Sequence, residues 1–270
     1  MSQAVQALDL VCGAGQVRIE YQWVGPQQAH LPVMVFLHEG LGSVSMWRDF
    51  PAQLCEAAPC RGLVYSRPGY GQSQALVPHD SWGPDFMHTQ ALQVLPALLD
   101  ALQLHQPVLL FGHSDGASIA LLLAAHAPQR VRALVAVAPH VFVEDKTVAG
   151  IARLQIEPVR TQLLASLARH HAHPTQLLDQ WTGAWLAPAF RAWSITETIA
   201  NVRCPLFAVQ GSDDEYGTMA QLDVLVQRTE ATEWMEIDNC GHWPHRDHAP
   251  QLLARACAFL QRLQGDMTCN

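Results

Sequence analysis

Short apolar runs recur along the chain and are separated by longer stretches with helical periodicity. The apolar runs are typical of buried strands: residues 33–37, 62–65, 108–111, 134–137 and 206–209, with a weaker run at 233–237. The helical patterns between and after them span residues 87–104, 117–127, 219–228 and 250–263. An alternating segment at 17–24 follows Gly13-Ala14-Gly15 and predicts an opening hairpin. Strands that alternate with helices predict an α/β fold: a mostly parallel central sheet flanked by helices, with function at the carboxyl ends of the strands.

One segment interrupts this alternation. Roughly 65 residues lie between the strand that ends near Pro139 and the strand that begins near Leu206, more than a crossover connection needs. The segment has helical character and carries several tryptophans. We expect a helical cap inserted at residues 140–201, and a core domain made of residues 1–139 and 202–270. The alternative is a peripheral helical pair that buries its tryptophans in a core of its own.

Composition limits the class of protein. Apolar residues make up 49% of the chain, which favours a folded core over disorder. A net charge of -8 with a single lysine, Lys146, argues against nucleic acid as a partner. The start has no signal-peptide pattern, and no uninterrupted apolar stretch is long enough for a membrane span, so we expect a cytoplasmic location and no membrane association. The 7 cysteines are scattered, and we expect them to be reduced thiols. The oligomeric state, including a homo-oligomer, stays open.

The most informative motif is Gly112-His113-Ser114-Asp115-Gly116, which fits the pattern G-x-S-x-G. It lies between a predicted buried strand and a predicted buried helix. A serine on a tight strand-to-helix turn projects its hydroxyl from the top of the sheet. The amides that begin the helix can then stabilise negative charge at the same place. We therefore predict that Ser114 is a nucleophile.

Further motifs in register with this one mark a family resemblance. They are Leu37-His38-Glu39-Gly40-Leu41-Gly42-Ser43, Arg67-Pro68-Gly69-Tyr70-Gly71-Gln72-Ser73, Gly211-Ser212-Asp213-Asp214 and Cys240-Gly241-His242. With these motifs the chain resembles the α/β-hydrolase superfamily, specifically its capped serine hydrolases, over nearly its whole length. The resemblance implies the α/β-hydrolase fold, a Ser-Asp-His triad in that chain order and catalysis without a cofactor. The Arg67 motif is interpreted as architectural, with Ser73 hydrogen-bonded to the loop backbone.

The resemblance also indicates the partners of Ser114. A serine hydroxyl needs a base, and His242 follows the last predicted strand, with His245 as the nearest competitor and a brace for the loop. The base needs a carboxylate to fix its tautomer. Relatives use the fourth residue of G-x-x-D, which selects Asp214, while Asp213 stays open as the alternative.

An oxyanion requires two backbone amides. One is expected from Asp115, whose side chain should point away from the oxyanion, toward Arg67. The other is expected from Gly40, in a loop where Glu39 replaces the first glycine of the common H-G-x-x-G. Glu39 either projects into the pocket or forms a salt bridge at its rim, and the sequence does not decide between the two.

The remaining candidates concern the substrate. His140, at the end of a strand, and Trp181 and Trp185, in the predicted cap, join Glu39 as candidate substrate-binding residues. No metal site is expected, because the cluster of His170, His171 and His173 lacks a carboxylate or cysteine at ligand spacing and fits a solvated helix end.

These residues predict a cofactor-independent serine hydrolase of a small ester, lactone, thioester or related carbonyl compound. The cap tryptophans favour a small-molecule substrate with an apolar or aromatic group. A carbon–carbon bond hydrolase or an acyltransferase of the same fold is the alternative. A ligand receptor that keeps the triad without useful turnover is another, and slow turnover with tight binding would distinguish it.

Overall fold

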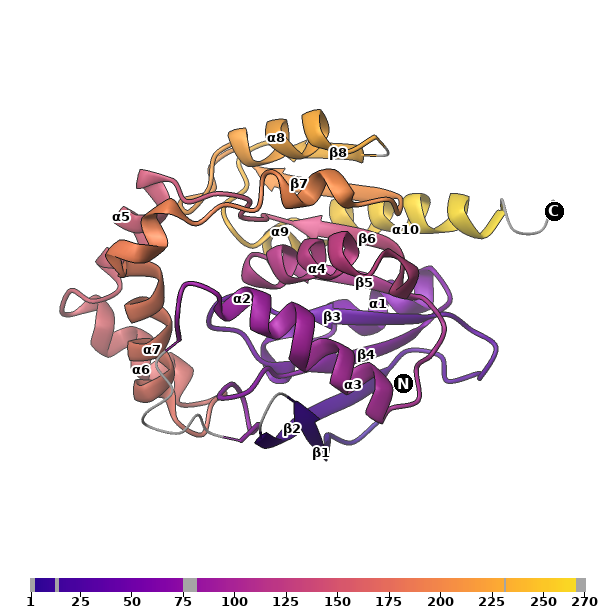
Figure 1. Cartoon of the computed structure of the whole chain (residues 1–270), viewed down its shortest axis with the longest axis horizontal. Coiled ribbons are helices and arrows are strands. Elements are labelled where there is room, and N and C mark those ends of the chain that lie inside the picture. Colours follow the sequence, from indigo (N-terminus) through magenta and orange to yellow (C-terminus); the bar gives the residue numbers. More distant parts are fainter. Residues whose placement is uncertain (1–2, 13–14, 75–81, 231, 266–270) are drawn as a thin grey trace.

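A computed structural model describes residues 3–12, 15–74, 82–230 and 232–265. Its centre is an eight-stranded sheet in the order β1-β2-β4-β3-β5-β6-β7-β8 (Figure 1). The strands are β1 (Gln6–Cys12), β2 (Gly15–Val24), β3 (Val33–Leu37), β4 (Arg61–Tyr65), β5 (Val108–His113), β6 (Val131–Val137), β7 (Leu206–Gly211) and β8 (Thr232–Ile237). Strands β3 to β8 pair in parallel, whereas β1 pairs antiparallel with β2, and β2 with β4.

The predicted fold class is confirmed, and the predicted strands match closely. The strands that follow residue 30 begin and end within three residues of the predicted runs. The runs of β3 to β7 are short, apolar and almost entirely buried, whereas β8 is largely exposed, which agrees with its weaker pattern. The opening hairpin is present as β1 and β2, although its turn at residues 13–14 lies outside the described residues. In the described part of the chain, no helix is long and apolar enough to cross a membrane.

Helices cover both faces of the sheet, and further helices lie beyond the carboxyl ends of its strands. They are α1 (Phe50–Ala57), α2 (Phe86–Thr89), α3 (Leu95–Ala101), α4 (Asp115–His126), α5 (Asp145–Arg153), α6 (Val159–Leu167), α7 (Pro174–Leu186), α8 (Ala220–Arg228), α9 (Pro244–Asp247) and α10 (Ala249–Gly265). Helix α1 carries no predicted pattern in the sequence analysis, and the predicted helix at 87–104 is divided by a π-helical turn at Gln90–Val94.

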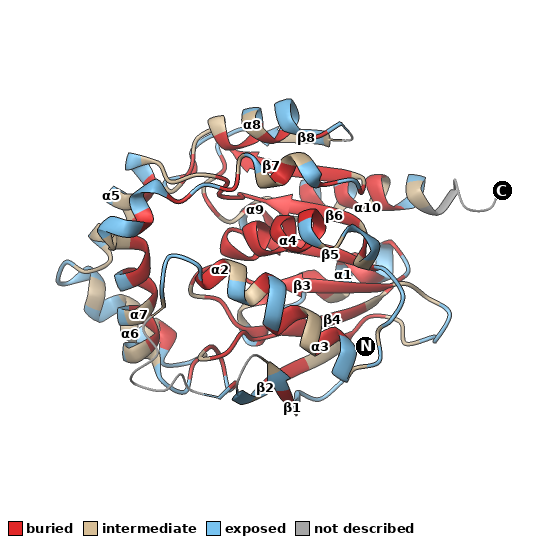
Figure 2. Cartoon of the chain, in the orientation of Figure 1, coloured by how far each residue is buried: buried red, intermediate tan, exposed pale blue. Residues whose placement is uncertain are grey.

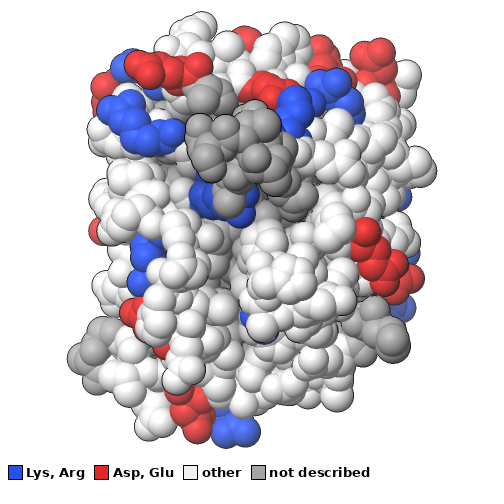
Figure 3. Space-filling model, turned by 90° about the vertical axis from the view of Figure 1, so that its right-hand side faces the viewer, with Lys and Arg blue, Asp and Glu red and all other residues white. Residues whose placement is uncertain are grey.

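Two hydrophobic clusters hold these layers together. One joins α2, α3, α4 and α8 to the sheet face that carries Val35 and Leu110, and the other joins α1 and α10 to the face that carries Phe36 and Phe111. Helix α4 is buried on every side from Asp115 to Ala125, which explains its continuous apolar sequence (Figure 2). On the face at the amino ends of the strands, acidic and basic side chains are scattered among uncharged ones, and the acidic ones lie toward its edges (Figure 3).

Helices α5, α6 and α7 form a helical insertion between β6 and β7, which we define as residues 140–201. The insertion lies beyond the carboxyl ends of the parallel strands, on the left in Figure 1. It therefore stands over the edge of the sheet where a ligand is expected in a fold of this kind.

The turn from β5 to α4 is sharp, because one residue separates the strand from the helix. Ser114 adopts a φ of 55° and a ψ of -121°, a conformation that L-residues rarely adopt. The glycines on either side let the chain reverse. A Cβ at Gly116 would lie 2.0 Å from the carbonyl oxygen of Leu37, so the first turn of α4 sits directly against the end of β3.

This contact predicts that Gly116→Ala destabilises the fold. The atom in the way is a backbone oxygen of a central strand, which cannot rotate aside, so we expect a loss of roughly 1–3 kcal/mol in the free energy of unfolding. Gly183→Ala is the matched control, since a Cβ there meets nothing within 4 Å and alanine favours a helix by about 0.5–1 kcal/mol. Urea unfolding measures both variants. Equal stability in the two would contradict the close contact.

Candidate active site

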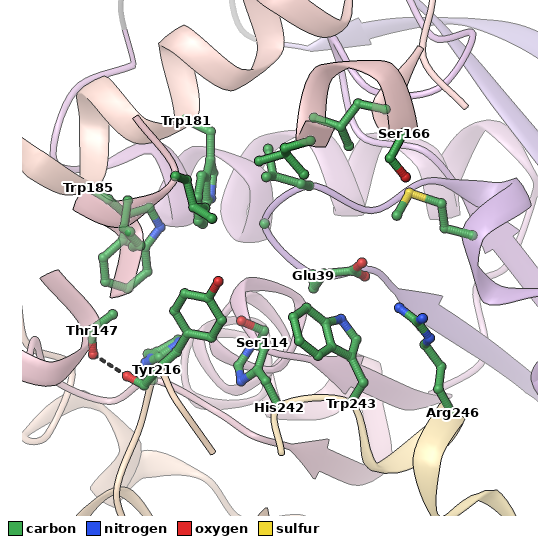
Figure 4. Close-up of a pocket in the computed structure, with 18 residues that line it drawn as sticks. Glu39, Ser114, Thr147, Ser166, Trp181, Trp185, Tyr216, His242, Trp243 and Arg246 are labelled. Atoms are coloured by element: carbon green, nitrogen blue, oxygen red, sulfur yellow. Dashed lines mark hydrogen bonds between the residues drawn. The ribbon is translucent and has the colours of Figure 1, made fainter. Parts of the chain in front are cut away.

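A cavity of about 240 Å³ opens where the insertion meets the carboxyl ends of the strands (Figure 4). Its floor is formed by the loops that follow β3, β5, β7 and β8, and its roof by the insertion. The predicted site residues on its wall are Glu39, Gly40, Ser114, His140, Trp181, Trp185 and His242. Most of the other wall residues are apolar, including Leu41, Met46, Ile151, Leu154 and Leu163. The cavity can hold a small, largely apolar molecule.

The cavity floor holds Ser114 and His242. Ser114 is 4% exposed and occupies the strained turn before α4, so its side chain stands at the amino end of that helix. Its own amide donates to the carbonyl of Val137, which fixes the turn to β6. His242 enters from the loop after β8 and is likewise 4% exposed. Both residues have little contact with bulk water and face the same space.

Asp214 lies behind His242 and is fully buried. Its Oδ2 is 2.8 Å from Nδ1 of His242 and also accepts a hydrogen bond from Nε2 of Gln210 at 2.7 Å. Its Oδ1 accepts the backbone N–H groups of Tyr216 at 2.7 Å and Gly217 at 3.1 Å. Since a carboxylate only accepts, Nδ1 of His242 carries a proton, and in the neutral imidazole Nε2 is the unprotonated nitrogen.

The two groups shift each other's protonation. Burial opposes protonation of His242, but the charge of Asp214 and their hydrogen bond outweigh it and raise the pKa of His242 above its ordinary value. Burial alone would raise the pKa of Asp214, yet the charge of His242 and the hydrogen bonds from His242 and Tyr216 lower it to about 2. Asp214 is therefore ionised at neutral pH.

The competing residues occupy different surroundings. Asp213 is exposed, and its carboxylate accepts a hydrogen bond from Ser212. His245 is buried between the rings of Trp47, at a centroid distance of 4.9 Å, and His113, at 4.6 Å. Burial and the neighbouring charge of His113 lower the pKa of His245 well below its ordinary value, so it stays neutral. Its place inside the core agrees with the expected role of a brace.

Glu39 lines the cavity and also points beneath it. Its Oε2 lies 3.7 Å from Nδ1 of His113, whose Nε2 donates to the carbonyl of His242 at 2.7 Å. Burial opposes ionisation, but the adjacent imidazoles of His113 and His245 lower the pKa of Glu39 below its ordinary value. A Cβ at Gly42 would lie 2.3 Å from this carboxylate, so the glycine makes room for it. Glu39 thus connects the loop after β3 with the loop that carries His242.

Arg67 holds the loop after β3 through hydrogen bonds to its backbone. It is 1% exposed and donates to the carbonyls of His38 at 3.0 Å and Glu39 at 2.9 Å. Asp115 points toward Arg67, as expected, with 3.9 Å between Oδ2 and Nη2. Ser73 donates to the carbonyl of Ser66 at 2.7 Å, which confirms the predicted bond to the loop backbone. Among the predicted site residues, Asp115 and Asp214 lie outside the cavity wall, and the others line it.

Two aromatic side chains of the insertion and one histidine enclose the cavity. Trp181 and Trp185 project from α7, and the ring of Trp185 meets His140 edge-on at 5.1 Å. His140 is 3% exposed, and burial together with the charge of His242 lowers its pKa to about 3. His140 is therefore a neutral group on the wall, 6.0 Å in ring-centroid distance from His242.

Among the wall residues that the sequence analysis did not predict, three lie close to His242 or Asp214 in the sequence. Tyr216 and Trp243 pack edge-on against the ring of His242, at centroid distances of 4.9 Å and 5.3 Å. Arg246 reaches the cavity from α9, with its guanidinium 5.7 Å from the Trp243 ring. The available signal was their position, because each lies within four residues of Asp214 or His242.

The interpretation of the histidine cluster as a solvated helix end is wrong for His171. This residue is 4% exposed, its Nδ1 accepts the N–H of Gly71 at 2.9 Å, and its Nε2 donates to the carbonyl of Leu41 at 3.0 Å. Burial lowers its pKa to about 4, so it is a neutral side chain that joins the insertion to the loops after β3 and β4. Within the described residues, no group of three His, Cys, Asp or Glu side chains is placed to hold a metal ion.

Several solved structures share this fold. A thermophilic esterase from Thermogutta terrifontis superposes with a TM-score of 0.69 and 17% identity, over 96% of this chain and 99% of that one. An enol-lactonase from Burkholderia xenovorans gives 0.70 and 18%, over 91% and 97%. A proline iminopeptidase from Mycobacterium smegmatis gives 0.69 and 17%, over 98% and 100%. At these identities the likeness concerns the fold. Residues 32–174 match the family described as alpha/beta hydrolase fold, more than half of the sequence, and the chain belongs to that family.

Proposed function

We propose that the chain is a cofactor-independent serine hydrolase of small esters, lactones or thioesters, acting through an acyl-enzyme. The observation that carries this proposal is the 2.8 Å contact between Asp214 and His242 at a cavity that Ser114 shares. Hydrolase neighbours of the same fold, among them an esterase and an enol-lactonase, support it.

In this mechanism Ser114 supplies the nucleophile. Its Oγ attacks the substrate carbonyl while Nε2 of His242 takes the hydroxyl proton. His242 then gives that proton to the leaving alkoxide, alcohol departs, and the acyl group remains on Ser114. A water molecule attacks the acyl-enzyme, His242 takes its proton, and the proton returns to Ser114 as the acid is released. Asp214 holds the imidazole in the reactive tautomer and stabilises its positive charge.

The oxyanion of each tetrahedral intermediate is proposed to lie between the amides of Gly40 and Asp115. Gly40 is on the cavity wall, and Asp115 begins α4, whose dipole favours negative charge there. Neither amide needs to move when charge develops, which is the condition for a large rate effect.

The insertion at residues 140–201 is proposed to act as a cap over the core formed by residues 1–139 and 202–270. Trp181, Trp185 and His140 would surround an apolar or aromatic acyl group, and Glu39 would face the substrate from the opposite loop. A cavity of about 240 Å³ favours acetyl to benzoyl esters over long-chain esters.

The first prediction concerns the nucleophile. Wild-type protein is expected to hydrolyse p-nitrophenyl esters of short or aromatic acids, and Ser114→Ala to lose at least roughly 10³-fold in kcat/KM. Ser166→Ala is the matched control, because Ser166 is a second serine on the same wall, and it should keep most of its kcat. Wild-type protein without turnover but with tight, saturable ligand binding would favour a receptor. Equal losses in both variants would contradict the role of Ser114.

The second prediction concerns the acid and pH. Because the base must be neutral, kcat/KM should fall as pH drops through the pKa of His242, which Asp214 holds above 6.5. Asp214→Asn removes the charge that raises this pKa, so the acidic limb should move to lower pH while kcat falls roughly 10⁴-fold. Asp213→Asn should change neither. If the acidic limb stays in place in Asp214→Asn, or if Asp213→Asn shifts the limb and lowers kcat, Asp213 is the carboxylate that orients His242.

A further inference from the structure

One side chain of the insertion contacts both residues proposed to supply the oxyanion amides. Nε1 of Trp181 donates to Oδ2 of Asp115 at 2.9 Å, in a contact buried from solvent. The same indole lies against Gly40, where a Cβ would come within 2.4 Å of three of its ring atoms. Figure 4 shows Trp181 projecting from α7 into the cavity, on the side opposite His242. The insertion therefore reaches the loop after β3 and the start of α4 at one point.

Asp115 is held from a second direction by Arg67. The guanidinium lies 3.9 Å from Oδ2, and it also donates to the carbonyls of His38 and Glu39, the two residues before Gly40. Trp181, Asp115 and Arg67 thus form a closed set of contacts around the Gly40 loop. In this set Trp181 packs against Gly40 on the cavity side, while Arg67 donates hydrogen bonds to the loop carbonyls from the side away from the cavity.

A buried carboxylate at position 115 loses the solvation of its charge, and its presence there needs an explanation. The side chain is 0% exposed, and burial raises the pKa of Asp115, although the charge of Arg67 and the hydrogen bond from Trp181 oppose this rise. Asp115 directly follows Ser114, so the negative charge of its side chain also works against an oxyanion at Ser114. The mechanism uses only the backbone amide of this residue, so the side chain must contribute in another way.

We propose that the Trp181–Asp115 hydrogen bond positions the oxyanion hole, with Trp181 as a positioning residue supplied by the insertion. This inference rests on the proposed hydrolase function. The bond fixes the start of α4 relative to the Gly40 loop, and so fixes the separation of the two donor amides. Since oxyanion stabilisation acts on the transition state, loss of the bond lowers kcat and leaves KM nearly unchanged. A wall residue that only binds the acyl group would show the reverse.

The kinetic test is Trp181→Phe assayed with p-nitrophenyl acetate, whose acyl group is too small to depend on the outer wall. Phenylalanine keeps an aromatic ring over Gly40 and removes the N–H. We expect kcat to fall roughly 10- to 100-fold, as a displacement of about 1 Å at a reacting centre would produce, with KM within twofold of wild type. A raised KM with unchanged kcat would overturn the positioning role.

Trp193→Phe is the matched control for this substitution. Trp193 is a second buried tryptophan of the insertion, its ring stacks on Phe190 at 5.3 Å, and its indole nitrogen has no hydrogen-bond partner among the described residues. It lies outside the cavity wall as described, so kcat should stay at the wild-type value. An equal loss in Trp193→Phe would assign the effect to general packing of the insertion and overturn the proposal.

A second measurement tests the contact without using activity. Protein labelled with ¹⁵N at its 8 tryptophans gives indole N–H cross-peaks, and the one lost in Trp181→Phe is assigned to Trp181. Asp115→Asn replaces a charged acceptor by a neutral one, so this cross-peak should move while that of Trp193 stays. An unmoved cross-peak in protein that hydrolyses esters would overturn this inference alone. Wild-type protein that hydrolyses no ester would overturn the proposed function, and the positioning role with it.

Discussion

The arrangement of the site depends on how closely the first turn of α4 approaches the end of β3. This approach leaves 2.0 Å between a Cβ at position 116 and the carbonyl oxygen of Leu37, so only glycine fits there. The strained backbone of Ser114 follows from the same reversal, since β5 must end and α4 begin within one residue. The buried strands of the sheet and α4, which is buried from Asp115 to Ala125, supply the packing that holds the strain. The amide end of a helix and the loop after β3 thereby meet at one point.

Buried polar contacts then fix the loops that surround this point. Arg67 joins the loop after β3 to Asp115, His171 ties the insertion to Gly71 and Leu41, and Asp214 accepts four hydrogen bonds around His242. Because these groups are shielded from water, an unpaired member would carry a large desolvation penalty. These contacts hold the loops around the cavity in fixed positions, which is the preorganisation that the proposed mechanism requires.

Most of the fold and part of the candidate site could be predicted from the sequence alone. The buried strands were readable because each is a short apolar run, and the turn at Ser114 because small residues separate a strand from a helix. Helix α1 was not recognised, since Phe50–Ala57 spans only 8 residues and its few apolar positions do not form a long periodic pattern. The orientation of Asp115 toward Arg67 was predicted, but the contacts of Asp115 with Trp181, of Glu39 with His113 and of His171 with Gly71 were not. They join residues 66, 74 and 100 or more positions apart, and no local pattern encodes such pairs.

The central claim is that Ser114 is an activated nucleophile, and intact-protein mass spectrometry after exposure to a fluorophosphonate tests it most directly. Such probes react with a serine only where a base and an oxyanion site activate it. The account predicts a single adduct on the wild-type protein, mapped to Ser114 by peptide analysis and absent from Ser114→Ala. No adduct on folded wild-type protein, or an adduct that persists in Ser114→Ala, would contradict it.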